Sequence, residues 1–195
     1  MPLSKIQSES MNLSDNYAFT GNISGAGGLV KLLTQSGVSA SSSYDIDSTY
    51  INSTYDDYYF ILKGTLSATV NLYARFFTSG SVVTTDYGYC LARMDENAYY
   101  IDIDGATEMR LFGGTVTSTG GFIIEGLITN VNDTALPTGM TYKVLKLYDT
   151  VNVRGETGIA GQDGTKWGTT VNGIRFYGSS GNIAINNFNL FGVAK

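Results

Sequence analysis

Hydrophobic and polar residues alternate with a period of two through most of the chain after residue 43. In DYYFILKG, the side chains of Tyr58, Phe60 and Leu62 share one face of an extended segment, and the intervening residues share the other. The same alternation recurs in VNLYARFF, AYYIDIDG, GGFIIEGLITNV and TYKVLKLYDTV. A period of two is typical of half-buried strands and predicts about seven to nine of them. In AYYIDIDG it places Ile103 toward the core and Asp102 and Asp104 toward solvent.

Turn-forming residues separate these segments. TSG, DG, GG and PTG lie between the alternating runs, and no run shows a sustained helical period with caps at its ends. Short strands joined by such turns are typical of two packed antiparallel sheets. The sequence therefore predicts an all-β antiparallel β-sandwich, jelly-roll-like, formed by residues 44–195.

The segment IRFYGSSGNIAI near the C-terminus contains two alternating arms around Gly178–Asn182. Ile174 and Phe176 alternate with polar neighbours before the glycines, and the alternation resumes at Ile183. Glycine readily adopts the positive φ that a tight turn needs. Phosphate-binding glycine loops open into a helix, whereas a strand-like segment follows here. We therefore interpret the segment as a terminal hairpin.

Residues 1–43 differ from the remainder of the chain. They are rich in Ser and Gly with scattered apolar positions, and GAGG at residues 25–28 is typical of a flexible joint. One interpretation is an extended N-terminal arm that packs on a neighbouring subunit and promotes assembly. The other is a first strand of the same domain. The pattern favours neither.

Two further stretches supply the candidate contact residues. RGETGIAGQDGTKWGTT has glycines at a spacing of three and the only tryptophan, Trp167, so we predict a long exposed loop with Trp167 and Asp163 as contacts for a ligand or partner. The Tyr- and Asp-rich stretch YDIDSTYINSTYDDYY adds Tyr55 as a third candidate. Tyrosines also suit packing on a sheet face or between subunits, and we favour packing for this stretch.

Composition narrows the functional classes. The chain has 195 residues, 43% of them hydrophobic and 15% charged, which indicates a folded domain. A net charge of −5 without runs of Lys or Arg argues against binding nucleic acid or anionic lipid. No stretch reaches membrane-spanning length, so we expect no membrane insertion. MPLSKIQSES lacks a signal-peptide core, so we expect synthesis in a cytoplasm without Sec export.

Candidate catalytic chemistry is sparse. The chain has no histidine, which excludes Ser-His-Asp and Cys-His catalysis. The single Cys90 cannot form an intrachain disulfide, and we interpret it as a buried, inert thiol. Asp102 and Asp104 could bind a cation or act as an acid and base, but outward strand carboxylates are usually solvated. We expect a non-enzymatic protein with no catalytic residues, no cofactor and no metal.

STYDDYYFILKG at residues 53–64 and NGIRFYGSSGNIAINNFNLFGV at residues 172–193 together resemble a known class of module. This class is the jelly-roll module on surface appendages of tailed bacteriophages, particularly marine and cyanobacterial podoviruses. The opening PLSKIQSESMNLSDNYAFTGNISGAGG resembles the lead-in segment of such modules in tail fibres. The likeness concerns fold and setting and transfers no catalytic residue.

The resemblance implies a virion structural protein on the particle surface, either a tail fibre or spike or a capsid decoration. It implies a homo-oligomer, with three chains as the expected number, that contacts other virion proteins and contributes to host attachment. The alternative is a lectin-like, carbohydrate-binding module that recognises host cell-surface polysaccharide. Both functions can coexist in a receptor-binding fibre.

Overall fold

The computed structural model describes residues 28–93, 100–118, 120–147, 152–166 and 168–194. Thirteen strands and one short 3-10 turn lie within these ranges, and none of the described segments is a helix long and apolar enough to cross a bilayer. The elements are β1 (Leu29–Ser41), β2 (Tyr44–Ile46), β3 (Tyr58–Leu66), β4 (Leu72–Thr78), β5 (Ser81–Val82), β6 (Tyr87–Arg93), β7 (Tyr100–Ala106), β8 (Met109–Arg110), β9 (Gly121–Thr129), β10 (Gly139–Leu147), β11 (Val153–Gln162), η2 (Gly164–Lys166), β12 (Gly173–Gly178) and β13 (Ile183–Val193).

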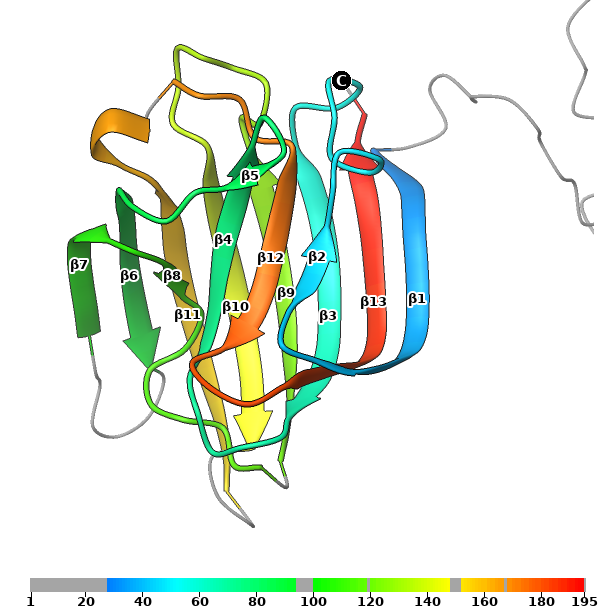
Figure 1. Cartoon of the computed structure of the whole chain (residues 1–195), viewed down its shortest axis with the longest axis vertical. Coiled ribbons are helices and arrows are strands. Elements are labelled where there is room, and N and C mark those ends of the chain that lie inside the picture. The colour runs from blue at the N-terminus through cyan, green and yellow to red at the C-terminus, as the bar shows by residue number, and fades with distance from the viewer. Residues whose placement is uncertain (1–27, 94–99, 119, 148–151, 167, 195) are drawn as a thin grey trace, which may run out of the picture.

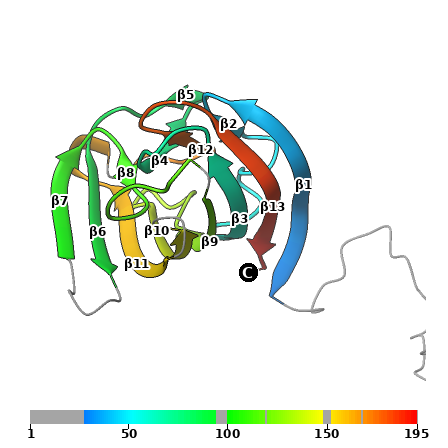
Figure 2. The same ribbon diagram turned by 90° about the horizontal axis from the view of Figure 1, so that it is seen from below.

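The strands form two antiparallel sheets of unequal size. The larger sheet has eight strands in the order β1-β13-β3-β9-β10-β11-β6-β7. The smaller sheet has the order β2-β12-β4-β5, and β8 pairs with β4. The larger sheet curves around the smaller one, so one of its faces points to the core and the other faces outward (Figures 1 and 2). The predicted all-β antiparallel sandwich is confirmed.

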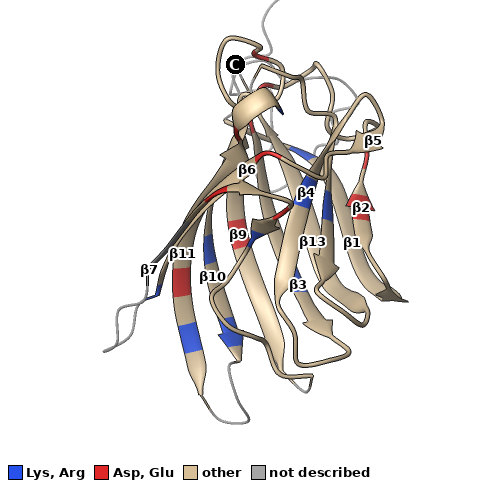
Figure 3. Cartoon of the chain, turned by 60° about the vertical axis from the view of Figure 1, so that its left-hand side comes forward, with Lys and Arg blue, Asp and Glu red and all other residues tan. Residues whose placement is uncertain are grey.

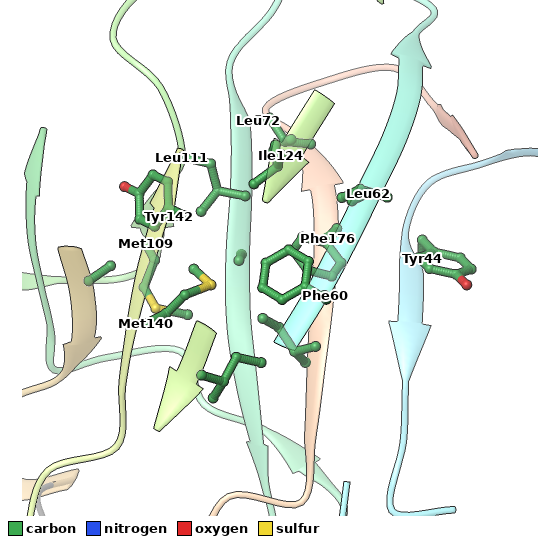
Figure 4. Close-up of a cluster of buried hydrophobic side chains, with 14 of the residues drawn as sticks. Tyr44, Phe60, Leu62, Leu72, Met109, Leu111, Ile124, Met140, Tyr142 and Phe176 are labelled. Carbon is green, nitrogen blue, oxygen red and sulfur yellow. The ribbon is translucent and has the colours of Figure 1, made fainter. Parts of the chain in front are cut away.

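The core lies between the two sheets and contains residues that the period-two pattern placed on one shared face of a strand. Tyr58, Phe60 and Leu62 of β3 are fully buried. The ring of Phe60 lies 5.5 Å from that of Phe176 on the opposite sheet and 6.2 Å from that of Phe188 (centroid distances; the wider cluster is shown in Figure 4). Burying such a side chain stabilises a fold by about 1.5–3 kcal/mol relative to exposure. Inward aromatic residues therefore join the two layers.

The stretch Leu29–Ser41 of the predicted arm is a strand of the sandwich. It forms β1 at the edge of the larger sheet and pairs antiparallel with β13 along most of its length. For these residues the structure shows the second alternative, a first strand of the same domain. The sandwich therefore includes residues before the predicted domain boundary at residue 43. Residues 1–27 of the predicted arm lie outside the described residues.

The predicted terminal hairpin is wrong. β12 belongs to the smaller sheet and β13 to the larger one, so the loop between them crosses from layer to layer. The centroids of the Phe176 and Phe188 rings lie 6.3 Å apart across the core. Two strands of a sandwich that face each other alternate just as two strands of a hairpin do, and the intervening loop suits both.

The predicted exposed loop RGETGIAGQDGTKWGTT is also wrong over its first part. Residues 153–162 form β11, which pairs with β10 on one side and β6 on the other. Gly158 faces the core, where a Cβ atom would lie 2.5 Å from Cζ of Tyr142 and 2.8 Å from Cδ2 of Leu91. The glycine is therefore a packing requirement of the strand, because it makes room for the Tyr142 ring.

Ile103 lies on the predicted face but is not buried. It pairs with Tyr89, whose neighbour Leu91 on the same face of β6 is in the core. Ile103 nevertheless remains exposed, because β7 is the last strand of the larger sheet and extends beyond the smaller one. Figure 2 shows this overhang at the left-hand end of the sheet.

Candidate functional site

Apolar side chains gather on the outer face of the larger sheet, which no element in the described ranges covers. Ile123 of β9 pairs with Leu145 of β10. Two residues further along β10, Leu147 pairs with Val153 of β11. Ile123, Leu145 and Val153 are 40%, 50% and 58% exposed. These three residues, which we call the apolar patch, border a depression of about 410 Å³. Contiguous exposed apolar side chains of this kind mark interaction surfaces.

Charges of both signs flank the apolar patch. Lys63 of β3 is the cross-strand partner of Ile123, and in the next row Glu125 of β9 pairs with Lys143 of β10. All three charged residues are exposed. Figure 3 shows charged residues of both signs on β9, β10 and β11. The rim of the apolar patch thus has an acidic position between two basic ones.

A second depression lies at the other end of the same face, near the start of β10. Gly139 of β10 pairs with Gly161 of β11, and Gly161 pairs with Gly88 of β6. Three glycines therefore lie side by side across three neighbouring strands. They form the floor of a pocket of about 410 Å³, which we call the glycine-lined hollow.

The walls of the glycine-lined hollow combine an apolar side chain, a thiol and two carboxylates. Ile159 is 57% exposed, and Cys90 is half-buried beside it as its cross-strand partner. The predicted burial of Cys90 is therefore wrong. A Cβ atom added at Gly88 would lie 3.5 Å from Oδ1 of Asp104 and 3.9 Å from Cβ of Asp163. Asp104 and Asp163 thus flank one glycine of the floor.

The turn after β11 fixes the position of Asp163. Its backbone nitrogen donates to the carbonyl oxygen of Asp86 at 2.7 Å, and its Oδ1 accepts from the nitrogen of Gly164 at 2.7 Å. The hydroxyl of Thr165 donates to Oδ2 of Asp86 at 2.7 Å. These bonds hold the backbone of Asp163 and one of its carboxylate oxygens at the rim.

The structure separates two of the three predicted contact residues, Asp163 and Tyr55. Asp163 lies at the glycine-lined hollow, whereas Tyr55 lies elsewhere, its ring edge-on against Tyr58 at 5.9 Å and close against Gly192. Trp167 and the side chain of Asp102 lie outside the described residues. Asp104, considered only as a cation or acid–base candidate, instead joins Asp163.

A buried ion pair is the most enclosed charged site of the described residues. Nζ of Lys146 lies 2.9 Å from Oε1 of Glu156, and both side chains are almost completely buried. Lys146 also donates to the carbonyl oxygen of Gly113 at 2.6 Å, while the nitrogen of Gly113 donates to Oε2 of Glu156 at 2.5 Å. The Phe112 ring lies 4.4 Å from Nζ, a cation–π distance.

This ion pair is structural. Burial lowers the pKa of Lys146, while its hydrogen bond and charge interaction with Glu156 act in the opposite direction. Because both side chains are enclosed in the core, a substrate has no access to them. The alternation in TYKVLKL already placed Lys146 on the inward face with Tyr142, and this signal was missed.

The described residues contain no group of three or more His, Cys, Asp or Glu side chains arranged to hold a metal ion. No protein-family model matches the chain, and no curated protein matches it significantly. Its function must therefore be argued from its own surface.

Proposed function

We propose that this protein is a non-enzymatic structural protein on the exterior of a tailed-bacteriophage particle, where it forms a homo-oligomer through the outer face of its larger sheet. The observation that carries the proposal is the apolar patch of Ile123, Leu145 and Val153 on an uncovered sheet face. A soluble sandwich gains nothing from leaving three apolar side chains together in water, whereas an assembling one buries them.

A second copy of the same chain is the occupant that this surface suits. Full burial of an aliphatic side chain contributes about 1.5–3 kcal/mol, and the patch residues retain roughly half of that gain for association. Glu125 lies between Lys63 and Lys143, so the rim presents both signs of charge to an identical surface. Charges of both signs can meet their opposites on another copy of the chain, which favours a homo-oligomer.

The resemblance to phage appendage modules supplies the setting. Its motifs lie on structural strands: STYDDYYFILKG contains most of β3, and NGIRFYGSSGNIAINNFNLFGV contains β12 and β13. A rigid sandwich with a long first strand suits a repeated exterior unit, as a tail fibre, spike or head decoration. In that setting we expect three chains and contacts with other virion proteins.

A second candidate function is recognition of host polysaccharide. The glycine-lined hollow favours it, because it is a recess on an accessible face with two carboxylates at its rim. This function is compatible with the first, since an exterior fibre can also bind the host.

Labelling of virus particles tests the proposed setting. We expect gold-conjugated antibodies against this chain to decorate intact particles of the phage that encodes it, at the tail or over the head. Antibodies against a cytoplasmic protein of the infected host serve as the control and should leave particles unlabelled. Particles that carry no label, with the chain confined to the infected cell, would contradict the proposal.

A further inference from the structure

We infer that the glycine-lined hollow binds one neutral pyranose ring of a polysaccharide. This inference deepens the second candidate function and names its site and ligand class. It does not depend on assembly through the apolar patch, which lies at the opposite end of the same sheet face.

Packing does not account for two of the three glycines. A Cβ atom at Gly88 or Gly139 would have its nearest neighbour at 3.5 Å, an ordinary contact distance. Only at Gly161 would it collide with backbone, 2.7 Å from the carbonyl oxygen of Thr138. Glycine within a strand weakens the strand, and it often marks a place where a ligand approaches the backbone closely.

The walls of the glycine-lined hollow also match the surface of a sugar ring. A pyranose presents an apolar face of C–H groups and a rim of hydroxyl groups. The exposed side chain of Ile159 offers an apolar surface beside the flat glycine floor. Asp104 and Asp163 converge on Gly88 and can each accept hydrogen bonds from hydroxyl groups. Hydrogen bonds to a carboxylate are about twice as strong as those between neutral groups.

The charge of the residues that line the hollow determines which sugars it can accept. Among the described residues that line the hollow, two are carboxylates and none is Lys or Arg. A phosphate or uronic acid would meet two negative charges there without a compensating cation. The volume of about 410 Å³ lies within the usual range for small-molecule sites, about 300–1,000 Å³. The hollow therefore favours an uncharged sugar.

Cys90 provides a site-specific probe of occupancy, because it is the only cysteine and lines the hollow. The rate of its alkylation by iodoacetamide, followed by mass spectrometry, would be measured with the full chain. The probes are hexasaccharides of glucose, mannose and galactose, each at about 10 mM. At ten times the dissociation constant, a neutral ligand should slow alkylation about tenfold. Oligogalacturonate should leave the rate unchanged.

Matched variants locate the effect. Gly88→Ala combined with Gly139→Ala places two methyl groups on the floor without a collision and should weaken binding about tenfold or more. Gly155→Ala, on the outer face of β11 with no atom within 4 Å of the added methyl, should bind like the unmodified chain. Asp104→Asn, at an exposed position, should cost about tenfold through loss of a charged acceptor. Near-UV circular dichroism checks that each variant is folded.

Several results would overturn the inference. One is that no neutral probe slows the alkylation of Cys90. Another is that oligogalacturonate slows it instead, and a third is that EDTA abolishes the protection. Unchanged binding by the double glycine variant would show that the sugar binds elsewhere. Light scattering of the same samples reports assembly separately, so failure of this inference leaves the proposal on the apolar patch to its own test.

Discussion

Replacing Lys146 by Met should lower the free energy of unfolding by about 3–5 kcal/mol, the usual effect of removing one partner of a buried ion pair. Glu156 would remain in the core as a carboxylate without its cation, and the carbonyl oxygen of Gly113 would lose its 2.6 Å hydrogen bond. The loss of hydrophobic volume is small, because Met and Lys have similar lengths. Urea unfolding followed by tryptophan fluorescence or circular dichroism measures the change.

Lys31→Met is the matched control, since Lys31 is an exposed lysine of β1 that lies outside the apolar patch and its rim. It should change the unfolding free energy by no more than about 0.5 kcal/mol. The combined variant Lys146→Met with Glu156→Gln should lose less unfolding free energy than the sum of the losses of its two single variants. Each single change leaves the other charge buried without a partner. A Lys146→Met protein as stable as the control would refute the structural role of the pair.

Alkaline pH should unfold the protein as its buried tyrosines ionise. Burial raises the pKa values of Tyr58, Tyr87 and Tyr142 above the ordinary value of about 10. Their hydroxyl groups donate to the carbonyl oxygens of Asn52, Val83 and Arg110, and ionisation removes each of these donors.

The sign follows from proton binding. Above about pH 10 the folded state keeps protons on these tyrosines that the unfolded state releases, so stability is intact below pH 10 and falls above it. Each such group contributes a slope of about −1.4 kcal/mol per pH unit until its folded pKa is reached. Lys146 acts in the opposite sense, because its lowered pKa means that the unfolded state binds the extra proton.

Tyrosinate absorbance at alkaline pH, recorded together with circular dichroism, measures this behaviour. Absorbance from the buried tyrosines should rise only as the sheet signal is lost. Tyr142→Phe should make the decline in stability with pH shallower by about 1.4 kcal/mol per pH unit. Full tyrosine ionisation while the protein remains folded would contradict the burial of these hydroxyl groups.

The period-two alternation was sufficient to predict the fold class, since it depends on local burial. It placed Tyr58, Phe60 and Leu62 on one face of a strand, and the structure buries that face. It could not assign strands to sheets, because residues facing each other across a sandwich alternate like residues side by side in one sheet. The mistaken hairpin between β12 and β13 is a direct consequence.

Glycine-rich segments were the second source of error. A strand whose neighbours crowd it requires glycine for space, and β11 uses Gly158 in this way beneath Tyr142. From sequence, the same residues suggest a loop. The candidate site depended even more on pairing: Gly88, Gly139 and Gly161 are far apart in the chain and meet only through the register of β6, β10 and β11. The sequence suggested Asp163 as a candidate contact residue but could not indicate its proximity to Asp104.

The mass of the full chain in solution tests assembly through the apolar patch most directly. Multi-angle light scattering at micromolar concentration should give a homo-oligomer for the unmodified protein. Leu145→Glu, which places a charge in the patch, should give the mass of one chain. Leu136→Glu alters a loop leucine that is 47% exposed against 50% for Leu145, and it should retain the oligomer. A monomer for the unmodified chain, or an oligomer that survives Leu145→Glu, would contradict this account.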